Sequence, residues 1–288
     1  MKIKVLVLGK SGMLGSMVYK YLKDNSDFEV KGTERDIFDA EKFIHKPDKY
    51  VIVKNYDYII NCIGIIKPYC NDDDLDGVRR AIKVNAMFPH VLANYVKDDN
   101  TKVIQIATDC VYSGKEGNYK EDIPHDALDV YGKTKSLGEV FDEKHFLNVR
   151  CSIIGPELKG KLSLLEWFLN QEKGTELKGF THHKWNGVTT LQFSKLCEKI
   201  IEKDLFNKLV EVSTLHHFIP NTTVDKYELL NIFQDVFVTD YQIEAVDDIG
   251  SPIDRSIDTN YKLLATIYPA QDMKSAIEEL DQYLKSNK

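Results

Sequence analysis

The chain has 288 residues, of which 43% are hydrophobic and 29% are charged, and its formal net charge is −7. These values are typical of a globular protein with one large α/β domain, or with a cofactor-binding domain and a smaller lobe. The acidic balance and the lack of a basic cluster argue against nucleic acid as the main partner.

The cysteines and the first apolar run argue against a disulfide-rich, metal-binding, secreted or membrane protein. The five cysteines are odd in number and none has CxxC spacing, so the sequence predicts neither a disulfide framework nor a metal site. We therefore expect a reduced protein of the cytoplasm. The apolar run over residues 3–8 is too short for a signal sequence or a membrane span, and no membrane partner is expected.

The first half of the chain alternates between apolar runs and helical patterns. Strands are predicted at residues 3–8, 28–33, 57–63, 102–106 and 146–149. Helices are predicted at residues 13–22, 75–96 and 130–141, with Pro89 disturbing the second of them. This alternation predicts an α/β protein with a parallel, doubly wound sheet of the Rossmann type.

The regular alternation weakens after Pro156. Helices are predicted at residues 164–170, 189–203, 225–236 and 273–284, and a strand is predicted at residues 176–179. We expect residues 1–155 to form the cofactor-binding domain and residues 156–288 to form mainly a smaller α/β substrate lobe. Part of 186–212 is expected to return to the main sheet.

A GxxGxxG run joins the first predicted strand to the first predicted helix, which is the context in which such a run binds a dinucleotide. Gly9 permits a sharp turn, Gly12 lets the backbone approach a pyrophosphate, and Gly15 allows close packing of helix on strand. The start of the helix adds N–H donors and a positive dipole end. A tight turn without a ligand is the alternative. The other cofactor-binding candidates in this loop are Ser11, Met13 and Leu14.

The end of the second predicted strand bears on the choice of cofactor. Glu34 or Asp36 would bind the ribose diol of NAD, whereas Arg35 would pair with the 2′-phosphate of NADP. We favour NADPH because Arg35 lies just past the strand, and NADH stays an alternative, as does a solvated Arg35. At the end of the third strand, small residues leave room for the adenosine part of the cofactor, and the candidates there are Asn61, Cys62 and Gly64.

Thr108, Tyr131 and Lys135 are the candidate catalytic residues. Thr108 follows the fourth strand, at the edge where ligands collect in open α/β sheets. Tyr131 and Lys135 are at i and i+4 at the start of a helix, so they share one face. An ammonium beside a phenol lowers the pKa of the phenol, which can then protonate a carbonyl oxygen as hydride reaches the carbon. Thr108 would hold that oxygen in line.

A YxxxK pair alone is equally typical of an ordinary amphipathic helix. Its specificity comes from the order of the motifs: a glycine loop, then a threonine at a strand end, then YxxxK at the start of the next helix. This order is the observation on which the prediction of an oxidoreductase depends.

Longer stretches resemble the extended short-chain dehydrogenase/reductases, and within them the dTDP-4-dehydrorhamnose reductase group. They are GKSGMLGS, NCIGIIKP, and ATDCVYSGKEGNYKEDIPHDALDVYGKTKSLGE. The resemblance implies NADPH-dependent reduction of the C4 ketone of a nucleoside-diphosphate 4-keto-6-deoxy sugar, whose product feeds glycan synthesis. It makes Thr108, Tyr131 and Lys135 the triad and implies that Asn85 helps to position the lysine beside the cofactor.

Cys110 departs from the pattern of these reductases, which carry an aromatic residue there. Plant-type bifunctional epimerase/reductases are more similar to this chain at that position. A thiol beside Asp109 could abstract a sugar proton if its pKa were lowered, so an added epimerase activity stays open. A small buried side chain without chemistry is the competing interpretation. A reductase of a UDP-2-acetamido-4-keto-6-deoxy sugar and an NADP-binding regulatory subunit without catalysis stay open as well.

Further residues are assigned to the nucleotide-sugar substrate. Arg255 would pair with the diphosphate and Trp185 would stack on a base or sugar, although burial in the core competes for Trp185. Asp109 and Cys110 would line the same site. The histidine pairs at 182–183 and 216–217 do not match a metal spacing and are predicted to lie in solvated loops. The oligomeric state stays open, with a homodimer as one alternative.

Overall fold

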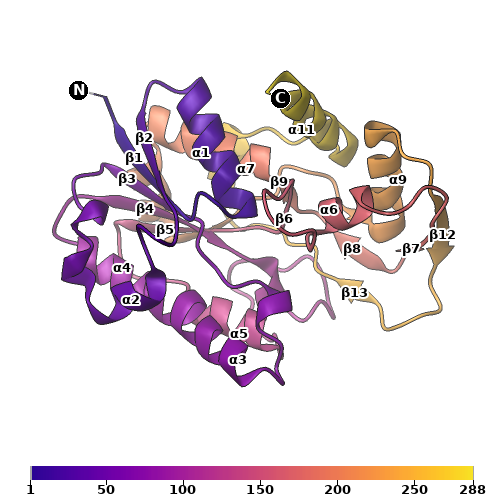
Figure 1. Cartoon of the computed structure of the whole chain (residues 1–288), viewed down its shortest axis with the longest axis horizontal. Helices are drawn as coiled ribbons and strands as arrows, with labels where there is room; N and C mark the ends of the chain where they lie inside the picture. The colour runs from indigo at the N-terminus through magenta and orange to yellow at the C-terminus, as the bar shows by residue number, and fades with distance from the viewer. Residues whose placement is uncertain (1, 288) are drawn as a thin grey trace.

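Six parallel strands form the central sheet of the computed structural model, which describes residues 2–287 (Figure 1). From one edge to the other they are β10 (Leu215–His217), β5 (Phe146–Arg150), β4 (Lys102–Ala107), β3 (Tyr58–Asn61), β1 (Lys4–Leu8) and β2 (Glu29–Thr33). Each pairing between neighbours is parallel. The doubly wound Rossmann-type sheet predicted from the alternation is therefore confirmed.

Alternate residues of a strand point to opposite faces of the sheet, and β1 shows how this builds two cores. Val5 and Val7 belong to one buried cluster, together with residues of α1 (Met13–Asn25) and α7 (Thr190–Glu202). Leu6 and Leu8 belong to the other, with α2 (Ala40–His45) and α4 (Phe88–Val96). Helices accordingly cover both faces of the sheet (Figure 1). All four of these β1 side chains are fully buried.

The helix predicted over residues 75–96 is interrupted. It consists of α3 (Leu75–Ala81), a π-helical segment η4 (Ile82–Met87) and α4, which has Pro89 in its first turn. Asn85 lies in the π-helical segment, and such segments occur frequently at functional sites. The helix predicted over residues 130–141 is shorter: α5 (Val130–Leu137) is followed by Gly138. A Cβ at Gly138 would overlap the carbonyl oxygen of Asn85, so the glycine lets α5 pack closely on the π-helical segment.

The smaller lobe contains two short sheets and a helix. In one sheet β7 (Glu176–Phe180) pairs with β12 (Gln242–Val246), and in the other β8 (His183–Trp185) lies between β11 (Val224–Asp225) and β13 (Ile253–Asp254). Helix α9 (Lys226–Phe237) packs on both sheets. The sequence predicted β7 and α9, but strands of two or three residues are too short to show periodicity. Shorter elements are α6 (Leu164–Leu169), β6 (Ile153–Ile154) with its partner β9 (Val188–Thr189), and α10 (Leu263–Ile267).

The chain passes between the two lobes several times. Helix α7 packs against α1, α8 (Phe206–Val212) packs against β5, and β10 completes the main sheet. The last helix, α11 (Met273–Ser286), packs on α9 and β9. The β13 segment is also tied to the loop that follows β4, because the N–H of Asp254 donates to the carbonyl of Gly114 at 2.7 Å. The lobes therefore share backbone hydrogen bonds.

The prediction of solvated loops for the histidine pairs was wrong for residues 216–217. His216 and His217 lie in β10 and their side chains are buried. His217 can be buried because its Nε2 lies 2.7 Å from Arg150 Nη1 and its Nδ1 lies 2.6 Å from the carbonyl of Asp258. His183 begins β8 and stacks on Phe180, so this pair is half-buried rather than solvated.

Two further findings concern membranes and metals. Over residues 2–287, no helix combines the length and the apolar character needed to cross a bilayer. The same residues contain no group of three His, Cys, Asp or Glu side chains that could hold a metal ion.

Candidate active site

A pocket opens where β1, β2 and β3 end, beside the glycine loop. Gly9 has a φ of +81°, and a Cβ at Gly15 would overlap the Gly9 carbonyl oxygen. The backbone here requires glycine at both positions. Gly12 caps α1 without a side-chain hydrogen bond, so its first-turn N–H groups are available to a ligand. The loop thus has the geometry that suits an anionic group. The candidates Gly9, Ser11, Gly12, Arg35, Cys62 and Gly64 line this pocket.

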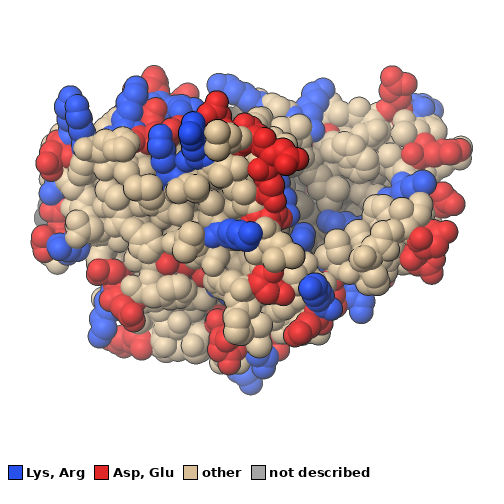
Figure 2. Space-filling model, turned by 90° about the horizontal axis from the view of Figure 1, so that it is seen from below, with Lys and Arg blue, Asp and Glu red and all other residues tan. Residues whose placement is uncertain are grey.

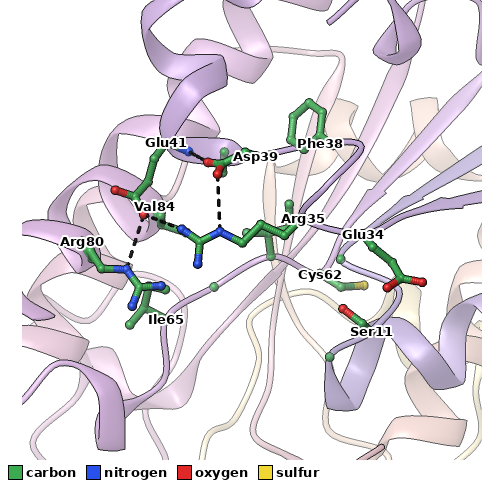
Figure 3. Close-up of a pocket in the computed structure, with 15 residues that line it drawn as sticks. Ser11, Glu34, Arg35, Phe38, Asp39, Glu41, Cys62, Ile65, Arg80 and Val84 are labelled. Carbon is green, nitrogen blue, oxygen red and sulfur yellow. Dashed lines mark hydrogen bonds and ion pairs between the residues drawn. The ribbon is translucent and has the colours of Figure 1, made fainter. Parts of the chain in front are cut away.

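Ion pairs surround the end of this pocket that lies beside α2 and α3 (Figure 3). Arg35 Nε lies 3.4 Å from Asp39 Oδ2, and its Nη2 lies 3.0 Å from Glu41 Oε1. Arg80 Nε, from α3, lies 3.4 Å from the same oxygen of Glu41. On the opposite side of Arg35, Glu34 pairs with Lys10. Sequence reasoning found Arg35 but missed Arg80 and Glu41, because only the folded chain brings α2 and α3 to this pocket.

Met13, Leu14 and Gly15 lie in the first turn of α1, beside the pocket but not in its lining. Their backbone N–H groups are the part of them that a ligand would reach. Leu14 and Gly15 are buried, and the Leu14 side chain belongs to the core cluster above β1.

Asn61 is not among the residues that line the pocket. Its Nδ2 donates to Gln105 Oε1 at 2.9 Å, and Gln105 Nε2 donates to Asn148 Oδ1 at 3.3 Å. The three residues are partners in the register of β3, β4 and β5. Their amides form a buried row across the sheet, which leaves Asn61 engaged in structure rather than open to a cofactor.

Asn85 connects the loop after β3 to helix α5, and its side-chain hydrogen bonds go to Ile65 and Thr134 rather than to Lys135. Its Oδ1 accepts from the N–H of Ile65 at 2.8 Å, and its Nδ2 donates to the carbonyl of Ile65 at 2.9 Å and to Thr134 Oγ1 at 3.2 Å. Lys135 is the next residue of α5. Asn85 therefore fixes the segment that carries the lysine, rather than the lysine side chain.

Thr108, Tyr131 and Lys135 come together at the carboxyl end of β4. Burial and the Cys110 thiol raise the pKa of Tyr131, and the nearby Thr108 hydroxyl acts to lower it. Lys135 Nζ donates to the carbonyl of Ile106 at 3.0 Å. Helix α5 can approach this strand end because a Cβ at Gly132 would overlap the carbonyl oxygen of Cys110.

The start of α5 is fixed by Asp129. Its Oδ1 accepts from the N–H of Gly132 at 2.7 Å, and Lys67 Nζ donates to its Oδ2 at 2.6 Å. The same ammonium lies 6.0 Å from the centre of the Tyr131 ring.

Burial dominates the proton affinities at this centre. It raises the pKa of Tyr131 above its ordinary value and lowers the pKa of Lys135 to about 8, although the nearby Glu139 opposes the second shift. The sequence-based expectation was a lowered tyrosine pKa, but desolvation of the phenolate outweighs that effect. At neutral pH the phenol is protonated and the lysine is charged, which is the pairing that a proton donor needs.

Asp109 and Cys110 follow Thr108 directly. Thr108 Oγ1 donates to Asp109 Oδ1 at 3.1 Å and accepts from the N–H of Cys110 at 3.2 Å. Burial, with the Asp109 carboxylate as the next cause, raises the pKa of Cys110 to about 12. A thiol in this state is protonated at neutral pH and is not an active base.

Figure 2 shows the molecule hollowed between the two lobes, with Lys and Arg side chains inside the hollow. Arg255 follows β13, and Lys226 is the first residue of α9. Burial lowers the pKa of Lys226 and the Asp109 carboxylate opposes this shift, so Lys226 lies near the residue that follows Thr108. Among residues 2–287 neither cation has a carboxylate at ion-pair distance, and the buried Nε of Arg255 has no hydrogen-bond partner. A lone lysine at the start of a helix gives no sequence signal, and Lys226 was missed.

Trp185 is buried in the core of the smaller lobe, with 6% of its surface exposed. A Cβ at Gly187 would overlap its indole ring, and Lys226 Nζ lies 5.3 Å from the ring centre. Little of the ring is left for stacking on a ligand.

Comparison with known proteins identifies the family. The family described as RmlD substrate binding domain matches residues 3–254. A dTDP-4-dehydrorhamnose reductase of Aggregatibacter actinomycetemcomitans is 31% identical over 147 residues, so the match spans 47% of this chain and 45% of that protein. Methionine adenosyltransferase 2 subunit beta of Danio rerio is 24% identical over 248 residues, 81% of this chain and 74% of that protein.

Solved structures agree on the fold. A dTDP-4-dehydrorhamnose reductase of Clostridium acetobutylicum superposes with a TM-score of 0.79 at 20% identity, covering 98% of this chain and 100% of that one. The corresponding enzyme of Bacillus anthracis, in complex with NADP, gives 0.77 at 17% identity and covers both chains completely. From the family match across residues 3–254, the chain belongs to the RmlD substrate binding domain family, within the extended short-chain dehydrogenase/reductases.

Proposed function

We propose that the protein reduces the C4 ketone of a nucleoside-diphosphate 4-keto-6-deoxy sugar with NADPH and so supplies a deoxyhexose for glycan synthesis. The observation that carries this proposal is the half-buried, protonated Tyr131 close to Thr108, with the charged Lys135 of the same helix at the end of the same strand. Membership of a family of nucleotide-sugar oxidoreductases supports it.

The residues of the pocket fit a dinucleotide. The uncapped first turn of α1 would hold the pyrophosphate through the backbone N–H groups of Ser11 to Gly15. Arg35 would hold the 2′-phosphate of NADPH at the adenosine end. Lys135, at the strand end nearest the substrate, would hold the nicotinamide ribose. When bound there, the cofactor supplies the hydride.

Proton transfer follows from the geometry of the triad. Tyr131 would donate to the ketone oxygen, and Thr108 would do so after its hydroxyl turns away from Asp109 Oδ1, so that both hold the ketone in line. Tyr131 would give its phenolic proton to the ketone oxygen, which would take the carbonyl π pair when C4 receives the hydride. The phenolate left on Tyr131 is stabilised by the Lys135 ammonium until solvent returns the proton.

The cations of the cleft support an anionic substrate. The side chains of Lys226 and Arg255 have no carboxylate at ion-pair distance among the described residues, so a ligand with two negative charges would compensate them. A diphosphate has this charge and accepts several hydrogen bonds from a guanidinium. We infer that the diphosphate of the substrate lies between the two side chains. The five free cysteines fit a reaction in the reducing cytoplasm.

The test is turnover with a panel of 4-keto-6-deoxy sugars linked to dTDP or UDP, including 2-acetamido sugars, followed by NADPH absorbance. We expect oxidation of NADPH with at least one of them. Tyr131→Phe should lower kcat by about 10²- to 10⁴-fold and leave NADPH binding unchanged. Full activity of Tyr131→Phe would refute the assignment of the proton donor.

A second candidate is an NADP-binding subunit without catalysis. It is favoured by the similarity to methionine adenosyltransferase 2 subunit beta over 81% of the chain. Tight NADPH binding without turnover on the whole panel would support this candidate, whereas turnover that depends on Tyr131 would exclude it. An added epimerase activity would appear as solvent deuterium at sugar C3 or C5, which a pure reductase leaves unlabelled.

A further inference from the structure

Three cations lie around one carboxylate beside the cofactor pocket, and Figure 3 shows two of them, Arg35 and Arg80. Glu41, in the first turn of α2, lies 3.0 Å from Arg35 Nη2 and 3.4 Å from Arg80 Nε, and its other oxygen lies 3.8 Å from Lys83 Nζ. Asp39 shares Arg35 at 3.4 Å. With three positive and two negative charges, this cluster keeps an excess of positive charge, which favours a further anion.

Arg80 has hydrogen-bonding capacity that the protein does not use. Its Nε is buried and lacks a hydrogen-bond partner among residues 2–287, since the Glu41 oxygen at 3.4 Å is poorly aligned. The Arg35 side chain, on the other side of Glu41, is 65% exposed. Ion pairs of exposed side chains contribute little to stability, so these pairs can exchange their anion. Figure 3 shows both guanidinium groups beside the Glu41 carboxylate, with a dashed line joining each of them to it.

The acidic residue beside Arg35 does not oppose this arrangement. Glu34 lines the same pocket and follows β2, where a free carboxylate would repel a phosphate and favour a ribose diol. Its Oε1 lies 3.3 Å from Lys10 Nζ, from the glycine loop. Lys10 therefore balances the charge of Glu34.

We propose that Arg80 is a second specificity residue for NADPH, and that the 2′-phosphate binds between Arg80 and Arg35 in place of the Glu41 carboxylate. This inference rests on the proposed function in that it takes the pocket to hold NADPH. A phosphate presents more charge and more acceptor oxygens than a carboxylate, and guanidinium groups bind it bidentately. Glu41 thus competes with the 2′-phosphate, while Arg80 favours it.

The experiment measures dissociation constants of the full-length protein for NADPH and NADH, and for 2′,5′-ADP and 5′-AMP, which differ only in the 2′-phosphate. Arg80→Gln should weaken NADPH and 2′,5′-ADP by about tenfold or more and leave NADH and 5′-AMP unchanged. Glu41→Gln should strengthen NADPH binding. Both effects should diminish at high salt, which screens charges at the surface.

Arg79→Gln is the matched control. Arg79 is the neighbour of Arg80 on α3, pairs with Asp76 at 3.6 Å and does not line the pocket, so its replacement should change neither dissociation constant. Arg80→Lys keeps the charge and should recover part of the NADPH affinity. If Arg80→Gln keeps the wild-type ratio of NADPH to NADH affinity, this inference is wrong while the proposed function stands. If the wild-type protein binds neither dinucleotide, both fail.

Discussion

The cofactor pocket and the cleft between the lobes both contain basic side chains, but they compensate them differently. In the pocket, Arg35 and Arg80 face the carboxylates of Asp39 and Glu41. In the cleft, Lys226 and Arg255 have no such partner among residues 2–287, and burial lowers the pKa of Lys226 to about 8.

The two sites differ in how an anionic ligand would be paired with the cations of the protein. At the pocket the ligand would displace a carboxylate of the protein, so the net gain in charge pairing would be small. At the cleft the ligand itself brings the compensating charge, so each cation contributes more. Substrate binding is therefore expected to depend more strongly on single cations and on pH than cofactor binding does.

Arg150 gives the extreme case of a compensated cation, and its removal is expected to have the largest effect on stability. Its side chain is fully buried, with Nε and Nη2 donating to Glu139 at 3.0 and 2.7 Å and Nη1 donating to Tyr112 Oη at 2.6 Å. Arg150→Met leaves Glu139 buried without its partner, which costs about 3–5 kcal/mol. Urea unfolding measures the change. Arg79→Gln, at an exposed pair, should shift the midpoint little.

Removing one cation from the cleft is expected to have the next largest effect. Lys226→Gln or Arg255→Gln should weaken binding of dTDP by about ten- to a hundredfold, because each loses a hydrogen bond to a charged group. Calorimetric titration of dTDP checks this, with NADPH affinity unchanged in the same variants. Lys178→Gln, an exposed lysine of β7, is the control. Equal dTDP affinity in all variants would contradict the assignment of the diphosphate to this cleft.

The pH dependence of dTDP binding should be smaller but diagnostic. The ammonium form of Lys226 binds the anion, and its pKa is about 8 in the free protein. The groups that act on it are Asp109, Arg255 and the Cys110 thiol, whose pKa of about 12 keeps it neutral in this range. Affinity should therefore fall as pH rises above about 8, by up to tenfold per unit.

Lys226→Arg should flatten this dependence, since arginine stays charged throughout. Calorimetric titrations of dTDP between pH 7 and 9.5 compare the pH dependence of its affinity for the wild-type protein and for Lys226→Arg. A slope that persists in Lys226→Arg would assign the titration to another group, and the pH response of NADPH binding in the same samples shows whether the cofactor pocket behaves differently.

Cys110→Ala should have the smallest effect. The thiol is protonated and no general base bonds to it, so the reductase reaction should keep its kcat and KM. Steady-state kinetics of this variant, with deuterium analysis of the product, tests both points. A large fall in kcat would show that the thiol contributes to the reduction, and solvent deuterium at sugar C3 or C5 that is lost in Cys110→Ala would support the epimerase hypothesis.

Local patterns accounted for the parts of the protein that lie close together in sequence. Each of these features occupies a short stretch of sequence: the glycine loop, the strands before it and after it, and the i, i+4 pair of Tyr131 and Lys135. Arg80, Glu41 and Lys226 reach their sites only because distant helices begin or pass there, and a lone charged residue on a helix has no signature.

The same limit explains the errors. His217 was predicted to be exposed because adjacent histidines suggest a polar loop, but Arg150 and Asp258, both distant in sequence, supply its partners. The pKa of Tyr131 was expected to fall, since the motif shows the nearby ammonium and not the packing that desolvates the phenol.

The row of amides formed by Asn61, Gln105 and Asn148 specifies the register of the central strands. The apolar residues around it are nearly interchangeable, so hydrophobic packing alone would tolerate a strand that slid along its neighbours. A slipped strand would leave these amides among hydrocarbon, at about 1–3 kcal/mol for each unpaired group. The row therefore fixes the register of β4 against β3 and β5, and with it the position of Thr108 directly after the strand. Under the proposed function, amides buried within the sheet would thus determine where the substrate ketone is held.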